Sequence, residues 1–374
     1  MKVRGFGKLS DGRSAGLYVL KNSCGMEVSV TDYGAAIASI IVPGKNDIGI
    51  DVVLGYGDAA SYEAGGSQFG ATVGRIANRV GDACFTLNGE TYEMTANNGS
   101  NALHGGRDFY NKRLWETKIP FASMSSGDVA AKVIAKESMN DWHQSYIQDD
   151  IRGDTVTFCL DSPDGDQGMP GNLHIEVTYM LTNDNELHID YEATCDRDTP
   201  VNLTNHSYFN LNGHGSETVL NQICRIDADR FTPCDEGLLP TGEVRSVSGT
   251  PMDFRIAKPL GADIRKDYEQ LKLAGGYDHN YVLNGSGYRE AATLYSESSG
   301  IHMSVLTDMP GMQLYTANGL GPEQGKGGAL YSVNSAVCFE TQFWPDSINK
   351  ENFPDSVLKA GERFTSRTTY RFIW

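Results

Sequence analysis

The fold class is indicated first by the stretch Phe85-Thr86-Leu87-Asn88-Gly89-Glu90-Thr91-Tyr92-Glu93-Met94. Two runs that alternate between apolar and polar residues flank Asn88-Gly89. This dipeptide favours a type I′ turn, because the turn needs positive φ at both of its central positions. The twist of such a turn matches that of two antiparallel strands. The stretch therefore predicts a β-hairpin.

Strand patterns recur on both sides of this hairpin. The chain has 42 glycines and 13 prolines, scattered rather than clustered, which favours many tight turns between short strands. The sequence therefore predicts an all-β fold. Alternating or short apolar runs closed by turn signals predict strands at 26–30, 37–42, 129–135, 155–160, 175–179 and 187–191.

One short helix is expected. Ile264, Tyr268 and Leu271 keep helical spacing, Asp263 can cap the first turn, and Gly275-Gly276 ends the run. No internal repeat, low-complexity tract or linker divides the sequence, so we expect residues 1–374 to form a single domain.

The charge balance limits the class of partner. Lys and Arg total 31 against 48 Asp and Glu, and the net charge of -17 repels phosphate backbones and anionic lipid surfaces. No apolar run approaches the ~20 residues that span a bilayer. We therefore expect a cytoplasmic protein without a nucleic-acid or membrane partner.

The seven cysteines are odd in number, widely spaced and without a Cys-x-x-Cys pair. This pattern fits neither a disulfide framework nor a zinc site. We interpret all seven as structural, because a free thiol in an apolar run such as Phe158-Cys159-Leu160 behaves as a small hydrophobe. The acidic stretch 161–166 lacks the spaced ligands of a calcium loop and is interpreted as a solvated turn.

The polar stretch Asn202-Leu203-Thr204-Asn205-His206-Ser207-Tyr208-Phe209-Asn210-Leu211 surrounds a histidine with hydrogen-bonding side chains. A histidine in such a setting is either a satisfied core group or a proton-transfer group. The stretch alone leaves both interpretations open.

Two further residues are candidates for chemistry. Glu340 follows four apolar residues, and a carboxylate is costly to bury there unless it is paired or titrates for a purpose. His104 precedes Gly105-Gly106, where the backbone can approach a ligand closely, so it is either exposed or faces a cleft.

The stretch 74–80 carries two arginines. The simpler interpretation is a surface strand with solvated guanidinium groups on Arg75 and Arg79. The alternative is that the planar Arg79 side chain, beside the Asn78 amide, binds vicinal hydroxyls or an oxyanion.

These candidates suggest acid–base chemistry on a polyhydroxylated neutral ligand. A glutamate and a histidine, with reference pKa values of ~4.3 and ~6.5, form a complementary base and acid near neutral pH. Asn78, Arg79, Asp278 and Gln313 supply groups that match hydroxyls. No nucleophilic serine elbow, phosphate loop or metal motif competes with them.

Nine motifs in order then identify a resemblance. The chain resembles the aldose 1-epimerase (galactose mutarotase) family nearly from end to end. The motifs are GRIANRV (74–80), NALHGG (101–106), PDGDQGMPGNL (163–173), TPVNLTNHSYFNL (199–211), TPCDEGLLPTG (232–242), TPMDFR (250–255), YDHNYVL (277–283), PGMQLYT (310–316) and ETQFWPDSIN (340–349).

The resemblance implies a fold, a reaction and a set of site residues. The implied fold is a large antiparallel β-sandwich of the galactose mutarotase type, and the implied reaction interconverts the anomers of aldohexoses such as glucose and galactose. Glu340 would remove the proton from the C1 hydroxyl while His206 protonates the ring oxygen, without a cofactor or metal. The implied sugar contacts are His104, Asn78, Arg79, Asp278 and Gln313, with Ser207 and Tyr208 lining the site.

Departures from the family pattern leave the preferred aldose open. Family members often have a glycine followed by Phe-Asp after the LHGG motif, whereas this chain has Phe109-Tyr110-Asn111, so we expect a bulkier loop beside His104. Phe343-Trp344 is a second place where the pocket shape could differ. A non-catalytic carbohydrate-binding module and a sugar-phosphate epimerase remain as alternatives, and we expect a monomer that binds a monosaccharide.

Overall fold

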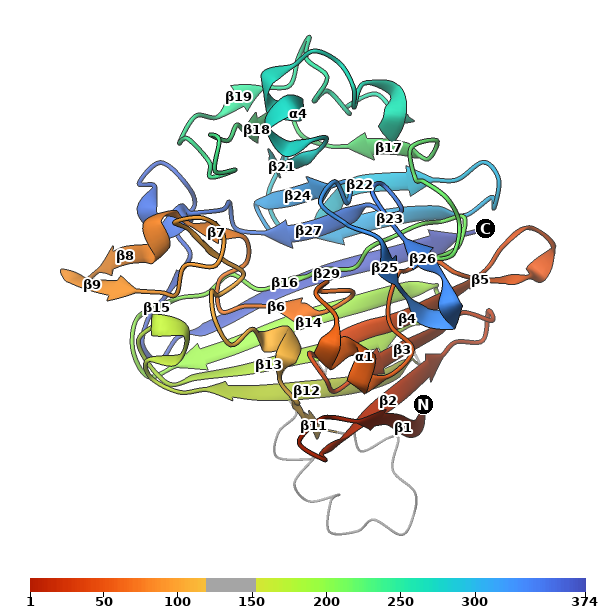
Figure 1. Ribbon diagram of the computed structural model, residues 1–374, viewed down its shortest axis with the longest axis horizontal. Helices are drawn as coiled ribbons and strands as arrows, with labels where there is room; N and C mark the ends of the chain where they lie inside the picture. Colours follow the sequence, from red (N-terminus) through yellow and green to blue (C-terminus); the bar gives the residue numbers. More distant parts are fainter. Residues whose placement is uncertain (119–152) are drawn as a thin grey trace.

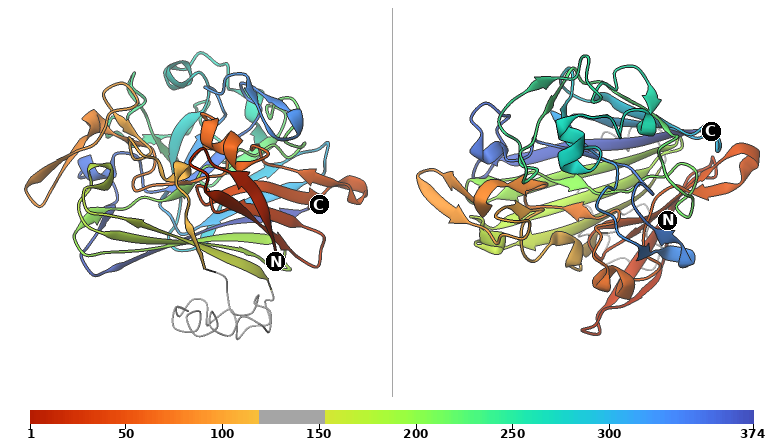
Figure 2. Two further views of the ribbon diagram at one scale, coloured as in Figure 1. Left: turned by 60° about the horizontal axis from the view of Figure 1, so that its bottom comes forward. Right: turned by 45° about the horizontal axis from the view of Figure 1, so that its top comes forward.

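Antiparallel strands are the predominant secondary structure of the computed structural model, which describes residues 1–118 and 153–374 (Figure 1). Its largest sheet has nine strands, and Figure 2 shows them as one twisted layer with most other segments gathered on one of its faces. In spatial order these strands are β11 (Glu116–Lys118), β12 (Asp154–Ser162), β13 (Leu173–Leu181), β14 (Glu186–Cys195), β29 (Arg363–Ile373), β23 (His302–Thr307), β22 (Arg289–Tyr295), β17 (Ile223–Ile226) and β20 (Lys258–Pro259).

Two further sheets have five strands each. The N-terminal sheet consists, in spatial order, of β1 (Lys2–Lys8), β2 (Ser14–Lys21), β3 (Glu27–Thr31), β4 (Ala36–Pro43) and β5 (Gly49–Asp51). The other, called the site sheet below, consists of β19 (Arg245–Ser246), β18 (Arg230–Thr232), β21 (Asp278–Val282), β24 (Gly311–Tyr315) and β27 (Cys338–Gln342).

Short strand pairs and helical turns connect these sheets. The pairs are β6 (Thr72–Val73) with β16 (Thr204–Asn205), β7 (Arg79–Val80) with β10 (Ala102–Leu103), β8 (Cys84–Leu87) with β9 (Glu90–Glu93), β15 (Thr199–Pro200) with β28 (Val357–Leu358), and β25 (Glu323–Gln324) with β26 (Leu330–Tyr331). The helices are α1 (Ala59–Ala64) and α4 (Glu269–Ala274), with 3-10 turns at Lys45–Asp47, Gly81–Ala83, Tyr110–Lys112, Asp166–Gly168, Leu260–Ala262, Lys326–Gly328 and Ser347–Asn349.

Alternation along the strands builds the core. Phe158 of β12 and Ile175 and Val177 of β13 are fully buried in one apolar cluster that extends from β2 to β29. The residues between them point to the opposite face of the sheet, because successive side chains of a strand alternate. The all-β prediction is confirmed.

The hairpin predicted at 85–94 forms as β8 and β9. Asn88 and Gly89 have φ of 53° and 81°, as a type I′ turn requires. The strands predicted at 26–30, 37–42, 155–160, 175–179 and 187–191 lie on β3, β4, β12, β13 and β14. The strand predicted at 129–135 lies outside the described residues.

The predicted helix starts later than its sequence pattern suggested. It begins at Glu269, with Tyr268 as the residue before the first turn, and Gly275 ends it at a φ of 68°. Asp263 does not cap it, because its carboxylate binds the ammonium groups of Lys258 and Lys266 instead.

The expected surface position of Arg75 is wrong. Arg75 is fully buried, and its guanidinium donates to Ser162, Thr199 and the backbone carbonyl of Pro170. These acceptors compensate the loss of water around the buried cation, which the local sequence could not reveal. Arg79 is buried as well.

Within residues 1–118 and 153–374, no helix has the length and apolar character that a membrane crossing requires.

Candidate active site

Glu340 lies at the centre of β27, in the site sheet. It is directly opposite Gln313 of β24, which in turn is opposite Asn280 of β21. Directly opposed side chains share one face of a sheet, and so do residues two positions apart on a strand. The register therefore places Asp278 on the same face as Glu340, although 62 residues separate them in the sequence.

His206 reaches this face from another part of the fold. It directly follows β16, which pairs with β6 and lies outside the site sheet. Its ring stacks on that of Tyr208, with centroids 4.8 Å apart and planes 9° from parallel. This stacking fixes the plane of the imidazole.

His104 and Asn78 are joined by two hydrogen bonds, at the ends of the paired strands β10 and β7. The backbone N–H of His104 donates to the carbonyl of Asn78 at 2.9 Å, and the N–H of Asn78 donates to His104 Nδ1 at 3.1 Å. Burial and the nearby charges of His206 and Arg79 lower the pKa of His104 well below its usual value. The neutral ring therefore carries its proton on Nε2, which is a hydrogen-bond donor.

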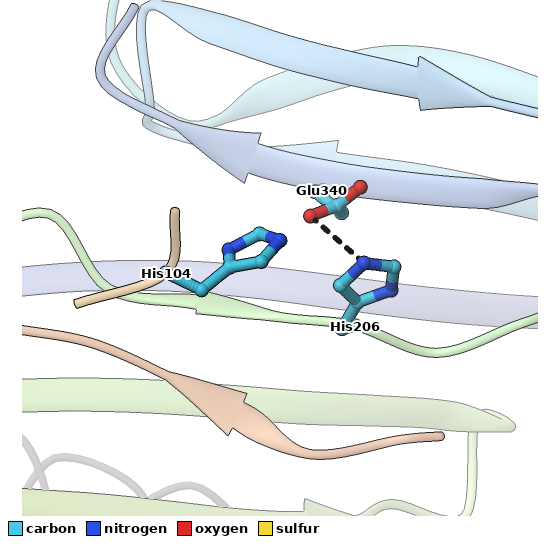
Figure 3. A group of neighbouring side chains, drawn as sticks. All are labelled: His104, His206 and Glu340. Atoms are coloured by element: carbon cyan, nitrogen blue, oxygen red, sulfur yellow. Dashed lines mark ion pairs between the residues drawn. The ribbon is translucent and has the colours of Figure 1, made fainter. Parts of the chain in front are cut away.

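Three of these side chains converge, as Figure 3 shows. His206 Nε2 lies 3.6 Å from Glu340 Oε2, and the two side chains are only 7% and 3% exposed. Glu340 Oε2 and His206 Nδ1 are buried without a hydrogen-bond partner among the described residues. Buried polar atoms normally have partners, so these two atoms keep hydrogen-bonding capacity that a bound ligand could use.

Burial dominates the proton equilibria of the pair. It raises the pKa of Glu340 well above its usual value, with the Asp278 carboxylate adding to the effect and Arg79 opposing it. Burial also lowers the pKa of His206 to about 4. Both shifts favour the uncharged forms, a protonated carboxyl and a neutral imidazole, which together hold one proton.

Arg79 and Asp278 form the polar wall next to this pair. Arg79 Nη2 lies 3.9 Å from Asp278 Oδ2, and the Gln313 amide donates to Asp278 Oδ1 at 2.7 Å. Arg79 is further held by Asn98, whose Oδ1 accepts from Arg79 Nε at 2.9 Å. A guanidinium and a carboxylate side by side offer both donors and acceptors to vicinal hydroxyls.

These groups line a pocket of about 340 Å³, within the ~300–1,000 Å³ of ligand pockets in proteins. Seven of the nine residues expected at the site line it: Asn78, Arg79, His104, His206, Tyr208, Asp278 and Glu340. The other two lie behind this lining. Ser207 donates to the Asn205 side chain at 2.6 Å, and Gln313 binds Asp278.

No site role was predicted for the remaining lining residues, although Leu103, Leu238 and Tyr315 stand within the quoted motifs. These residues come mainly from loops and include glycines, apolar side chains and polar ones. They are Gly66, Ser67, Gln68, Leu103, Leu238, Ala274, Tyr315, Asn318, Gly319 and Leu320.

The two departures expected to reshape the pocket do not line it. Tyr110 is buried, and its ring packs edge-on against that of Trp115. Trp344 packs against Phe353 and donates from its indole nitrogen to the carbonyl of Pro310.

Metal binding at this site is disfavoured by the state of one histidine. His104, His206 and Glu340 could each offer one ligand atom, and these atoms lie within 4.8 Å of one another. However, a neutral ring whose Nδ1 accepts from Asn78 holds its proton on Nε2. That nitrogen can donate to a hydroxyl but has no lone pair for a metal.

Comparison with known proteins identifies the family. The family model described as Aldose 1-epimerase matches residues 16–371. The chain belongs to the aldose 1-epimerase family. Galactose mutarotase of Bos taurus is 38% identical over 349 residues, which cover 93% of this chain and 91% of that protein. Aldose 1-epimerase of Escherichia coli K12 is 36% identical over 367 residues, which cover 97% and 96%.

Solved structures of aldose 1-epimerase relatives share the fold. The GalM/aldose epimerase homologue of Caenorhabditis elegans is 31% identical, with a TM-score of 0.81 and coverage of 96% of this chain and 99% of that one. Galactose 1-epimerase of Lactobacillus acidophilus is 28% identical, with a TM-score of 0.82 and coverage of 100% and 98%. The predicted sandwich type is confirmed, and family membership makes the chain an isomerase that interconverts aldose anomers.

Proposed function

We propose that the protein interconverts the α and β anomers of free aldohexoses, with glucose and galactose as substrates and Glu340 and His206 as the catalytic pair. The observation that carries the proposal is the buried contact between these side chains, 3.6 Å apart in a polar pocket. A base and an acid in one buried site can act on two neighbouring oxygens of the same sugar.

The proposed reaction opens and recloses the sugar ring. Glu340 as carboxylate takes the proton of the C1 hydroxyl, His206 as imidazolium gives its proton to the ring oxygen, and the bond from C1 to the ring oxygen breaks. The aldehyde then rotates about the C1–C2 bond. Closure returns both protons, since Glu340 now donates to the former aldehyde oxygen and His206 accepts from the attacking hydroxyl.

The other pocket residues orient the sugar for this exchange. We assign to His104 the donation of a hydrogen bond from Nε2, and to Asn78, Arg79 and Asp278 the binding of hydroxyls. Gln313 holds the Asp278 carboxylate from behind, so its contribution is to positioning. General acid and base catalysis contribute ~10²- to 10⁴-fold each, and orientation adds to this.

The substrate is proposed to be a neutral sugar. Arg79 is the one Lys or Arg side chain among the described residues that line the pocket, and Asp278 lies beside it. A phosphate would need an uncompensated cation, which this arrangement does not offer. This argues against the sugar-phosphate alternative.

Polarimetry tests the proposed function directly. Freshly dissolved α-D-glucose and α-D-galactose should reach their equilibrium rotation faster with the protein than in buffer alone, and the final rotation should be unchanged. If the protein bound galactose by calorimetry but left the rate at that of buffer, the carbohydrate-binding module would replace the enzyme.

Three broader assignments accompany this function. We propose a single domain, because one apolar cluster contains residues from Tyr18 to Phe372. We propose a monomer, since one chain supplies the whole described pocket lining. We also propose a cytoplasmic location, because all seven cysteines are free thiols, as is usual in a reducing compartment.

A further inference from the structure

A second group of titratable side chains lies on the nine-stranded sheet, apart from the pocket. Cys159 of β12 is directly opposite Glu176 of β13, and Asp161 is directly opposite His174. These four residues share the face opposite to Phe158 and Ile175, whose side chains belong to the core. We call Cys159, Asp161, His174 and Glu176 the strand-face cluster.

The strand-face cluster corrects the interpretation of Cys159 as a small core hydrophobe. Cys159 is only 4% exposed, yet it belongs to none of the apolar clusters of the described residues. The thiol, His174 and Glu176 offer ligand atoms that all lie within 4.8 Å of one another. The apolar neighbours of Cys159 in the sequence point to the other face.

The contacts of His174 resemble those of a metal-binding histidine. Its Nδ1 lies 2.6 Å from Asp161 Oδ1, and its Nε2 lies 3.2 Å from Glu176 Oε1. Histidines that bind metals generally donate their second ring N–H to a carboxylate, which fixes the ring and directs the other nitrogen to the ion. Asp161 is placed to fix the ring in this way, with Nε2 directed toward Glu176.

A lysine ammonium also lies against the converging atoms. Lys118 Nζ of β11 donates to Glu176 Oε1 at 2.6 Å, and its side chain is 42% exposed. A lysine side chain that is partly exposed can rotate into solvent. An imidazole nitrogen, a carboxylate oxygen and a sulfur that meet at one point match the ligand preferences of zinc.

We propose that the strand-face cluster binds a zinc-class divalent cation through Cys159 Sγ, His174 Nε2 and Glu176 Oε1, with Asp161 orienting the histidine and the ion replacing the Lys118 ammonium. This proposal is independent of the proposed function. Ligand atoms around tetrahedral zinc are ~3.5 Å apart, so small rotations of the partly exposed His174 and Glu176 side chains complete the site. The thiol releases its proton to solvent on binding.

Cobalt(II) provides a probe that reports the sulfur ligand. The full-length protein, freed of metal with a chelator, should bind one Co²⁺ and develop a thiolate-to-cobalt charge-transfer absorption that Zn²⁺ then abolishes. Cys159→Ser should lose this absorption while its mutarotation rate stays unchanged. The matched control is Cys24→Ser, because Cys24 is an exposed free thiol elsewhere on the chain and its loss should change nothing.

Further variants separate the proposed ligands from neighbouring charges. Asp161→Asn should lower the Zn²⁺ affinity by ~10- to 100-fold, because it removes the carboxylate partner of a metal-binding histidine. His174→Gln and Glu176→Gln should each lower it at least as much. Lys118→Met should instead raise it, because this change removes the competing ammonium. An ordinary ion-paired surface would give no such opposite effects.

Melting temperatures distinguish the loss of a metal site from a variant that folds poorly. Zn²⁺ should raise the melting temperature of the wild-type protein and of Cys24→Ser but not that of Cys159→Ser, since a ligand that binds the native state stabilises it. The proposal is overturned if the wild-type protein shows no charge-transfer absorption, or if Cys159→Ser keeps it. It is equally overturned if the bound metal is displaced by galactose and lost in His206→Asn, since the metal would then lie in the pocket.

Discussion

Single residues decide the chemistry of the pocket. Glu340 lies on β27 and His206 directly follows β16 of a different sheet, and burial shifts their pKa values in opposite directions. Both shifts favour the uncharged forms, because a buried charge loses its hydration. The pair is therefore most easily charged once a sugar and its hydrogen bonds fill the pocket.

Replacing Glu340 by glutamine should separate binding from catalysis. Glutamine keeps the shape of the side chain but cannot accept the C1 proton, so turnover should fall by ~10²-fold or more while galactose affinity changes modestly. Polarimetry gives the rate and calorimetry the affinity. Glu290→Gln, a partly exposed carboxylate outside the pocket lining, is the control and should keep the wild-type rate. Equal loss in both variants would contradict the assignment.

The dependence of kcat/KM on pH should be bell-shaped, because the proposed mechanism requires the pair to hold one proton. On the acidic side the pair gains a second proton at His206, whose pKa is about 4. On the basic side the pair loses its last proton. Burial raises the pKa of Glu340, so the carboxyl keeps this proton to a higher pH than usual. The acidic limb therefore belongs to His206 and the basic limb to Glu340, which is the reverse of the order of their reference pKa values. Because the two groups are coupled, the two pKa values that the profile measures belong to the pair.

The measurement is the enzymatic rate after subtraction of the buffer rate at each pH. The acidic limb should disappear from the residual activity of His206→Asn. A flat profile in the wild-type protein, or an acidic limb that persists in that variant, would remove the support for the pair.

At the scale of elements, one loop holds two segments of the site in place. The Gln167 side chain accepts from Arg75 N at 2.9 Å and donates to the Gly74 carbonyl at 3.3 Å. A Cβ added at Gly105 would lie 2.5 Å from Gln167 Nε2, so only glycine fits beside it. The loop thereby connects the segment before Asn78 to the segment after His104.

Gln167→Ala should therefore destabilise the protein and loosen the pocket. The change leaves a buried N–H and a buried carbonyl unpaired, at a cost of ~1–3 kcal/mol for each group. Urea unfolding measures this loss, and KM for galactose should rise. Gln324→Ala, at an exposed glutamine, should leave both quantities unchanged. An unaltered unfolding midpoint for Gln167→Ala would show that the loop is not needed to hold these segments.

At the scale of the whole molecule, net charge and buried histidines set the behaviour in solution. Affinity should favour glucose over glucose 6-phosphate, because the chain carries a net charge of -17 and the pocket lining has one arginine beside a carboxylate. Competition assays by polarimetry at constant ionic strength measure the ratio. The neutral-sugar assignment would be contradicted if glucose 6-phosphate inhibited more strongly than a mixture of glucose and inorganic phosphate.

Buried histidines should also make the fold sensitive to acid. Burial lowers the pKa of His279 to about 3, whereas the unfolded chain has a value near 6.5. Between these values the unfolded chain binds more protons, so stability rises with pH and is lost as pH falls from 6.5 toward 3. His279→Gln should remove this contribution, and the stability difference between wild type and variant should shrink on acidification. Urea unfolding at several pH values checks this, and a constant difference would contradict it.

The sequence by itself determined the local elements and predicted the candidate reactive groups. The Asn88-Gly89 turn and the alternation in β12 and β13 depend on backbone sterics and a two-residue period, which neighbours in the sequence specify. The polar stretch around His206 and the apolar run before Glu340 could likewise be read from their neighbours in the sequence. The nine motifs then related these residues to one reaction.

Only the tertiary structure decided which groups meet and in which state. The burial of Arg75 and the proton position on His104 depend on partners far away in the sequence. The same holds for Cys159, whose apolar neighbours in the sequence point to the other face of its sheet while Glu176 and Lys118 surround its thiol. Strand register and packing set these contacts, and neither is encoded in any short stretch of the chain.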